Sequence, residues 1–403
     1  PSPPSAPTLS TVKMRFLSCV IASLLALCHI GMAALTNIPM PTKPHDKLVP
    51  KVMIFAPEAE VWYKNLPNSG LGDLLALNVS VPGLSPKYPY VHCTLGGSIC
   101  QVTTCEGEIN AASTMMALVL SNQFDLLKTY FLVAGIGGVN PKHSTIGGVA
   151  LARYAVQVAL QYEFDAREMP ENFTTGYVTY GTMMPNSYPT TLYGTEVMEL
   201  NQALRDVAYN YAINANLTDN DSSQAYRARY QPAGRIFAQA TNSPSVVKCD
   251  SATSDVYYSG ALLSEAFENI TSVLTNGTGV YCMTAQEDNA TLEVLVRMHV
   301  HRLVDFARVI VMRTGSNFDR PPPGVTPYQH LLVLQQNGFV VAIQNIYQAG
   351  IEIVKGIMGD WDTTFDKGVK PCNYVGDIWG TLGGHPDFGP GSVTTGEAVV
   401  PAV

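Results

Sequence analysis

The sequence is poor in charged residues, and it has no Lys/Arg-rich stretch. Of its 403 residues only 14% are charged, and the formal net charge is −8. An acidic chain of this kind is not expected to bind a nucleic-acid backbone. Hydrophobic residues make up 46%, which excludes a wholly disordered chain, and the composition excludes collagen. A large folded protein remains.

The motifs of several common kinds of site are also absent. The chain has no C-x-x-C pair, and its cysteine spacings do not suit zinc. It lacks the G-x-S-x-G of serine hydrolases, the G-x-G-x-x-G of dinucleotide sites and the Lys-Ser/Thr of a P-loop. We therefore expect neither a metal nor a cofactor.

Only the amino-terminal region contains a long apolar run. Residue Arg15, the run after it and the small residues up to Ala33 predict a signal peptide over 14–33, with 1–13 as an upstream leader. A single amino-terminal membrane anchor is the alternative. No later stretch reaches the ~18 apolar residues of a spanning helix, so we expect no membrane span after cleavage. This pattern predicts secretion to the cell wall or the medium.

Two further features are typical of the secretory pathway. N-x-S/T sequons occur at Asn78, Asn172, Asn216, Asn220, Asn269, Asn276 and Asn289. Six cysteines follow the predicted cleavage site, namely Cys93, Cys100, Cys105, Cys249, Cys282 and Cys372. An even number permits disulfides in an oxidising compartment, but the sequence leaves their pairing open.

Apolar strands alternate with helical segments after residue 50. Strands are expected at 50–56, 90–104 (a hairpin), 130–135, 145–163, 176–180 and 307–315, and helices from about 58 and at 108–122, 195–212, 287–303 and 327–358. The alternation predicts one α/β domain over 50–375, with a central mixed sheet flanked by helices. The other segments are an extended lead-in at 34–49, a polar surface insertion at 216–245 and a flexible tail at 376–403.

Polar side chains follow the predicted strands. They include Glu58 and Glu60 after the first strand, and the segments 135–140, 286–289 and 313–319 further on. Ligands of α/β sheets bind beyond the carboxyl ends of the strands, where carboxylates and amides could hold sugar hydroxyls and a heterocycle. The acids Glu58, Glu287 and Asp288 also occupy positions that favour ordinary helix capping.

Five motifs give the chain a family resemblance. They are KVMIFAPEAEVW (51–62), FLVAGIGGVNP (131–141), TSDVYYSG (253–260), TAQEDNATL (284–292) and VMRTGSNFDRPP (311–322). Over roughly residues 50–385 the chain resembles the purine nucleoside permease family of fungi and bacteria. The order of the motifs is similar to that in the purine nucleoside phosphorylase and nucleosidase superfamily. The resemblance implies a phosphorylase- or hydrolase-like fold and purine nucleosides as partners. It is also compatible with a homo-oligomer.

The resemblance also implies roles for individual residues. Glu60 would hold the attacking water, and Glu287, next to Gln286, would accept from the 2′- and 3′-hydroxyls of ribose. Asn317 would contact the purine at N7, with Asp319 in that role if the alignment slips by two residues. The remaining implied pocket residues are Gly135, Gly137, Gly138 and Asn140 along the base and ribose, and Tyr257 and Tyr258 at an aromatic wall. Asn289, in the same pocket wall as Glu287, is expected to carry no glycan.

These residue types suit cleavage of a ribosyl–purine bond. The reaction develops positive charge on the sugar and negative charge on the leaving base, so a group that hydrogen-bonds or protonates N7 lowers the barrier. Asn317 can only hydrogen-bond, whereas Asp319 could donate a proton if burial raised its pKa. A carboxylate such as Glu60 would orient water and stabilise the cationic sugar.

The distribution of arginine favours water over phosphate as the nucleophile. No arginine occurs from Ala34 to Ala152, and the position of the family's phosphate loop reads CEGEIN (105–110). Its two acids would oppose phosphate, which proteins prefer to bind through arginine. The sequence thus predicts a secreted purine nucleoside hydrolase that supports nucleoside uptake. Alternatives are a non-catalytic nucleoside-binding component of transport, a phosphorolytic enzyme, and a storage or defence protein.

Overall fold

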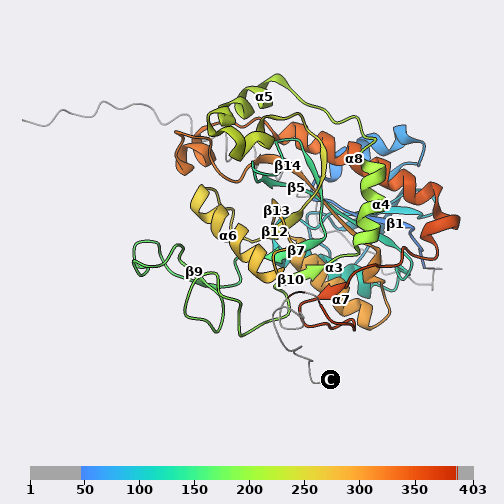
Figure 1. Ribbon diagram of the computed structural model, residues 1–403. Coiled ribbons are helices and arrows are strands. Elements are labelled where there is room, and N and C mark those ends of the chain that lie inside the picture. Colours follow the sequence, from blue (N-terminus) through green and yellow to red (C-terminus); the bar gives the residue numbers. More distant parts are fainter. Residues whose placement is uncertain (1–46, 387, 389–403) are drawn as a thin grey trace, which may run out of the picture. The chain divides into compact units, whose positions relative to one another are not determined.

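Four parallel strands form the centre of a large sheet. They lie in the order β4 (Ile99–Val102), β1 (Val52–Phe55), β5 (Tyr130–Val139) and β14 (Val309–Phe318). Because the strands are parallel, their carboxyl ends meet at one edge, which is where such sheets bind ligands. The computed structural model in Figure 1 describes residues 47–386 and residue 388. The predicted leader and signal peptide lie outside the described residues.

Nine further strands extend this centre into a mixed sheet of thirteen strands. On one side lie the antiparallel strands β3 (Tyr90–Cys93) and β2 (Leu77–Ser80). On the other side are β13 (Tyr281–Ala285), β12 (Asp250–Thr253), β7 (Tyr154–Gln157), β10 (Val197–Glu199) and β15 (Gly376–Asp377), while β6 (Val149–Leu151) and β11 (Val246–Lys248) branch off β14. A separate pair consists of β8 (Tyr162–Glu163) and β9 (Tyr177–Val178).

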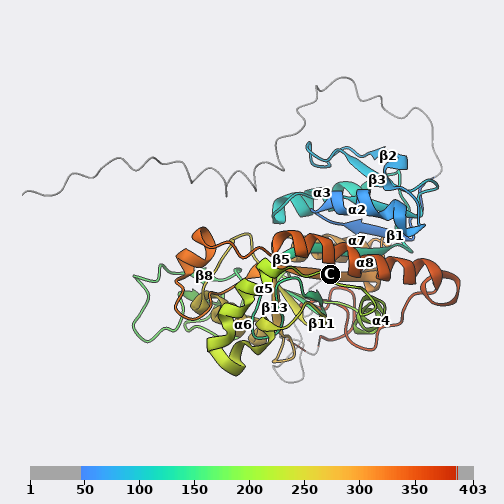
Figure 2. The same ribbon diagram turned by 90° about the horizontal axis from the view of Figure 1, so that it is seen from above.

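Side chains of the central strands alternate between the two faces of the sheet, and both faces are buried. Val52 and Ile54 face a core shared with α2 (Ala59–Asn65), α4 (Gln202–Ala212) and α8 (Phe339–Gly359), whereas Met53 and Phe55 face the core beneath α3 (Glu108–Leu120) and α7 (Asp288–Val300). Two more helices are α5 (Asp221–Arg227) and α6 (Ala261–Leu274). Helices on both faces can be followed in Figure 2. The predicted α/β domain with a central mixed sheet is confirmed.

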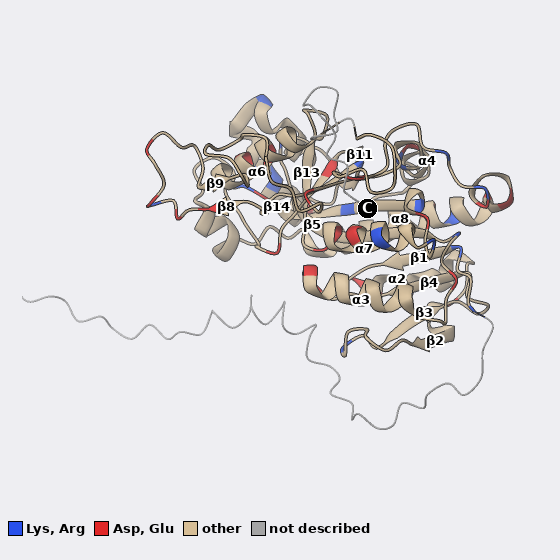
Figure 3. Ribbon diagram, turned by 90° about the horizontal axis from the view of Figure 1, so that it is seen from below, with Lys and Arg blue, Asp and Glu red and all other residues tan. Residues whose placement is uncertain are grey.

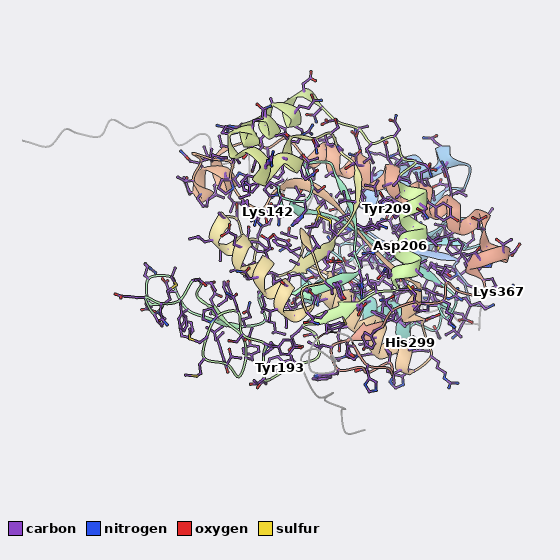
Figure 4. The ribbon with its side chains drawn as sticks, in the orientation of Figure 1. Lys142, Tyr193, Asp206, Tyr209, His299 and Lys367 are labelled. Carbon is purple, nitrogen blue, oxygen red and sulfur yellow. A yellow bond between two sulfur atoms is a disulfide. The ribbon has the colours of Figure 1, made fainter. Side chains whose placement is uncertain are left out.

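Side-chain contacts also tie the branch strands to the helices. Lys248, at the end of β11, places its Nζ 3.2 Å from an Oδ1 of Asp206 and 4.9 Å from the ring centroid of Tyr209. Asp206 and Tyr209 both lie on α4 (Figure 4). Two disulfides, Cys93–Cys100 between β3 and β4 and Cys249–Cys282 at β12 and β13, join neighbouring strands.

Three segments differ from the expectations. The single helix expected at 195–212 is strand β10 followed by α4, because Asn201 caps the helix by accepting a hydrogen bond from the Leu204 N–H at 3.2 Å. The segment 216–245 contains α5 and buries Tyr226 and Tyr230 in a core cluster, so it is more than a surface insertion. Strand β15 and the buried Phe388 lie within the expected flexible tail.

Within the described residues, no helix is both long enough and apolar enough to cross a membrane.

Candidate active site

Arg313 lies on β14, at the centre of a group of polar side chains that follow β1 and β13. It is 3% exposed, and its Nη2 donates to Oε2 of Glu287 at 2.9 Å and to Oδ1 of Asp288 at 2.5 Å. Its Nη1 donates to the carbonyl of Ile136 at 3.1 Å. One buried cation is therefore fixed by two adjacent acids and a carbonyl of β5.

Glu287 stands at the end of the loop from β13 into α7 and is held from both sides. Its Oε2 accepts from Arg313, and its Oε1 accepts from the N–H of Gly107 at 3.1 Å. It is the residue before α7, yet its side chain forms no capping hydrogen bond to that helix. The same is true of Glu58 before α2. Simple capping of their own helices therefore explains neither acid.

Glu58 brings a third carboxyl group to the same place. Its Oε2 is buried and has no hydrogen-bond partner among the described residues. Burial raises the pKa of Glu58 to about 7, the nearby Arg313 lowers it, and the charge of Glu287 raises it further. A carboxyl group with this pKa can exchange a proton near neutral pH.

The amino terminus of α3 is occupied by the protein's own carboxylates. The Gly107 N–H donates to Glu287, and the Glu108 N–H donates to Oδ1 of Asp255 at 2.8 Å. The Glu108 carboxylate accepts from the Gln157 side chain, and burial, with the charges of Asp255 and Glu287, raises its pKa to about 7. The amino-terminal ends of α3 and α7 are both acidic, as Figure 3 shows.

The glycines in the second half of β5 are required by close packing. A Cβ on Gly135 would lie 2.3 Å from Nη1 of Arg313, and one on Gly137 would lie 2.0 Å from the Thr284 carbonyl oxygen. The N–H of Gly138 donates to Oγ1 of Thr284 at 2.7 Å. These glycines let β5 pack closely against both Arg313 and β13. The family resemblance predicted that they line the base and ribose, and it did not predict this packing role.

Asn317, near the end of β14, and Tyr257 contact one another. The Ser316 hydroxyl donates to Oδ1 of Asn317 at 2.9 Å, and Asn317 forms a hydrogen bond with the Tyr257 hydroxyl. The β14–β5 register shifts between Gly315 and Asn317. Tyr257 is 57% exposed, so its ring is available to a ligand. Gln286 donates to the Asp255 carbonyl at 3.0 Å.

Asp319 belongs to a different, fully buried network. Its carboxylate accepts from Nε and Nη2 of Arg320 at 2.9 and 3.0 Å, and from the Tyr281 hydroxyl at 2.6 Å. The Tyr258 hydroxyl donates to that of Tyr281, and the Asn140 side chain donates to the Tyr281 carbonyl. Both oxygens of this carboxylate are therefore occupied by donors within the protein. We therefore correct the assignments of Asp319, Tyr258 and Asn140 from ligand contacts to structural support.

Glu60 also lies outside the group around Arg313. Its side chain is 66% exposed, and its Oε1 lies 2.5 Å from Nζ of Lys64, one turn later on α2. Glu58 precedes α2, whereas Glu60 lies in its first turn, and the two side chains have different surroundings. The position of Glu60 does not support the role predicted for it, and Glu58 is the acid that lies near Arg313. The sequence named Glu58 only as a strand-end acid and gave no sign that it would be buried.

Asn289 is the second residue of α7, and its side chain is buried against neighbouring backbone rather than exposed in a pocket wall. Its Nδ2 donates to the carbonyls of Thr195 at 2.8 Å and Ala155 at 3.3 Å, and the residue is 2% exposed. We expect this sequon to carry no glycan because the folded chain encloses the acceptor nitrogen. Glycopeptide mass spectrometry of protein from a secreting host tests this, with the exposed Asn269 as the comparison. Occupancy at Asn289 equal to that at Asn269 would contradict the expectation.

Comparison with known proteins gives the chain a family. Residues 49–370 match the family described as purine nucleoside permease (NUP). A purine nucleoside permease of Candida albicans is 45% identical over 362 residues, which cover 88% of this chain and 86% of the relative. A probable purine nucleoside permease of Schizosaccharomyces pombe is 39% identical, with 86% of this chain and 99% of that protein covered.

Solved structures with a similar arrangement are more distant. A 5′-methylthioadenosine/S-adenosylhomocysteine nucleosidase of Helicobacter pylori has a TM-score of 0.45 at 12% identity, over 78% of this chain and 100% of that one. The futalosine hydrolase of the same organism has a TM-score of 0.44 at 12% identity, over 77% of this chain and 98% of that one. The family match and the two fungal relatives decide the classification: the chain belongs to the purine nucleoside permease family.

Proposed function

We propose that this protein binds purine nucleosides outside the cell and hydrolyses their N-glycosidic bond to free base and ribose, in support of nucleoside uptake. The family and the names of the curated relatives support purine nucleosides as the ligand. Sequons and two disulfides support an extracellular location, because disulfides persist in oxidising compartments.

One observation carries the hydrolytic part of the proposal. A buried oxygen of Glu58 has no partner, and the group lies beside Arg313 and Glu287 with a pKa of about 7. A buried polar atom without a partner is costly, so a ligand or water molecule that supplies the missing hydrogen bond is favoured there. Water bound at this oxygen would lie next to a carboxylate able to take its proton.

The surrounding residues then divide the reaction between them. Glu287, fixed by Arg313 and the Gly107 N–H, accepts from the ribose hydroxyls. Water attacks C1′ while the bond from C1′ to the purine nitrogen breaks, and Glu58 takes the proton that water loses. The Asn317 amide donates to the purine and stabilises the electron pair that the base carries away. The departing base takes its proton from solvent.

The α3 terminus supports water rather than phosphate as the nucleophile. A helix amino terminus binds anions through its free N–H groups. Here the Gly107 and Glu108 N–H groups already donate to Glu287 and Asp255, and the Glu108 carboxylate sits in the first turn. An incoming phosphate would have to displace carboxylates and approach others, which like-charge repulsion opposes.

The expected result is therefore cleavage that does not depend on phosphate. Purified protein incubated with inosine or adenosine should release base at the same rate with and without inorganic phosphate, and the sugar product should be free ribose. Chromatography of both products measures this. Ribose 1-phosphate formed only when phosphate is present would refute hydrolysis in favour of phosphorolysis.

Binding without turnover is the second candidate function. It is favoured by Asn317, an amide that has no acidic proton to give to the leaving base, and by the permease names of the relatives. The same incubation distinguishes it, since tight binding of nucleoside by calorimetry with no released base would establish a binding protein.

A further inference from the structure

Asp288 is a fully buried carboxylate that the proposed reaction leaves without a role. It is the first residue of α7 and is 0% exposed. Its Oδ1 and Oδ2 lie 3.2 and 3.3 Å from Nε of Arg313, and Oδ1 also accepts from Nη2 of that residue. Both of its oxygens are therefore directed at the one cation of the site.

We propose that Asp288 is a positioning residue, which orients the Arg313 guanidinium toward Glu287 and offsets the charge of Arg313 beside Glu58. This inference rests on the proposed function, because it assigns Glu58 and Glu287 the roles given above.

The hydrogen bonds support the orienting part. Arginine presents its donors in a rigid fork, so fixing two edges fixes the plane. Asp288 holds Nε and Nη2, and the Ile136 carbonyl holds Nη1, which leaves Nη2 directed at Oε2 of Glu287. Without the Asp288 carboxylate, the buried Nε would lose its acceptor, and the guanidinium would turn toward Glu287, the other acid that it contacts among the described residues. Glu287 would then bind arginine more tightly and the ribose hydroxyls less well.

The charges support the offsetting part. The groups that face Glu58 are Arg313 from β14, which lowers its pKa, Glu287 from the start of α7, which raises it, and the Ile136 N–H of β5, which lowers it. Further out, Glu108 and Asp255 interact with one another, and Glu287 also faces Glu108. Asp288 counters the positive charge of Arg313 at close range. Removing the Asp288 charge leaves Arg313 freer to stabilise the Glu58 anion.

If Asp288 only stabilised helix α7, its replacement would give a different experimental result. Acids in a first turn interact favourably with the helix dipole, and that contribution affects stability alone. A purely structural Asp288 would therefore change the melting temperature and lower activity equally at every pH.

The test compares Asp288→Asn, which keeps the shape and removes the charge, with Asp305→Asn. Asp305 forms an ion pair with Arg308, at 3.2 Å from its Nε, in a part of the chain outside the site. For Asp288→Asn we expect kcat/KM for a purine ribonucleoside to fall about 10-fold to 100-fold, the range for a lost charge-assisted hydrogen bond. The acidic limb of the pH profile should move down by about one pH unit, since a nearby charge shifts a pKa by that order. Asp305→Asn should change neither.

A double-mutant cycle separates positioning from folding. If Asp288 acts through Arg313, Asp288→Asn should cost little further activity in a protein that already carries Arg313→Gln. That double variant removes both charges of the Arg313–Asp288 ion pair, so neither of these two charges is left buried alone, and it remains informative should Asp288→Asn unfold. An equal loss in both backgrounds, or an unmoved acidic limb, would overturn the proposal.

A measurement without turnover distinguishes this proposal from the proposed function. Carbon-13 NMR of protein labelled at the glutamate carboxyl, with Glu58→Gln to assign the signal, follows the titration of Glu58 directly. The Glu58 midpoint should fall in Asp288→Asn. If wild-type protein cleaves no nucleoside while the midpoint still moves, the hydrolase proposal fails and the role of Asp288 stands. If cleavage occurs and the Glu58 midpoint stays unchanged, the hydrolase proposal stands and the proposed role of Asp288 fails.

Discussion

Glu58→Gln is expected to lose most nucleoside hydrolysis while nucleoside binding is kept. The amide preserves the shape of the side chain but cannot take a proton from water, and general base catalysis typically contributes ~10²–10⁴-fold. We expect kcat to fall by this order, with a change in Kd smaller than about threefold because Glu58 makes no ground-state ion pair with substrate in this scheme. Steady-state kinetics and calorimetry on the same preparation measure the two quantities.

Glu60→Gln is the matched control, since it removes an acid of the same type two residues away. Glu60 is exposed and pairs with Lys64, so its loss should leave kcat unchanged. The pH profile gives a second check on Glu58. Because the base must be ionised and burial raises its pKa to about 7, activity should rise with pH through about 7 and fall below it. If Glu60→Gln were the inactive variant and Glu58→Gln the active one, the site described here would be wrong.

Glu287→Ala is expected to remove recognition of ribose. Two charge-assisted hydrogen bonds to the sugar diol are lost, each worth ~1.5–3 kcal/mol, and every ~1.4 kcal/mol is tenfold in affinity. Binding or kcat/KM for ribonucleosides should therefore weaken by about 100-fold or more. Arg313 keeps Asp288 as its partner in this variant, so the fold should be retained.

The sugar itself provides the control for this prediction. Wild-type protein should prefer ribonucleosides over 2′-deoxyribonucleosides, since Glu287 would contact a hydroxyl that the deoxy sugar lacks. Glu287→Ala should bind both kinds about equally. A variant that still discriminated between the two sugars, or that bound ribonucleosides like the wild type, would show that another residue holds the diol.

The architecture was predictable from the sequence because it depends on local patterns. Short apolar runs separated by amphipathic helices give strands that must be buried on both faces, and the central strands are buried in this way. The same reasoning predicted a site at the carboxyl edge of these strands, because polar residues that follow parallel strands meet at one edge. It also identified Glu287 and Asn317 as members of that edge.

Which side chain of each strand-end pair enters the site was decided only by the tertiary structure. Glu58 and Glu60 are the same residue type two positions apart, and only the path of the chain from β1 into α2 buries one and exposes the other. Asn317 and Asp319 differ in the same way, since Arg320 and Tyr281 draw Asp319 into a separate buried network.

The electrostatics of the site depend on contacts between residues that are far apart in the chain. Glu287 and Gly107 are 180 residues apart, and Glu108 and Asp255 are 147 apart, yet their hydrogen bonds decide whether the α3 terminus can hold an anion. By itself the sequence determined the sheet and its flanking helices, and it predicted the edge at which ligands would bind. The tertiary structure decided which acids are buried there and what each one contacts, because burial and distance, which set the charge of a carboxyl group, are properties of the folded chain.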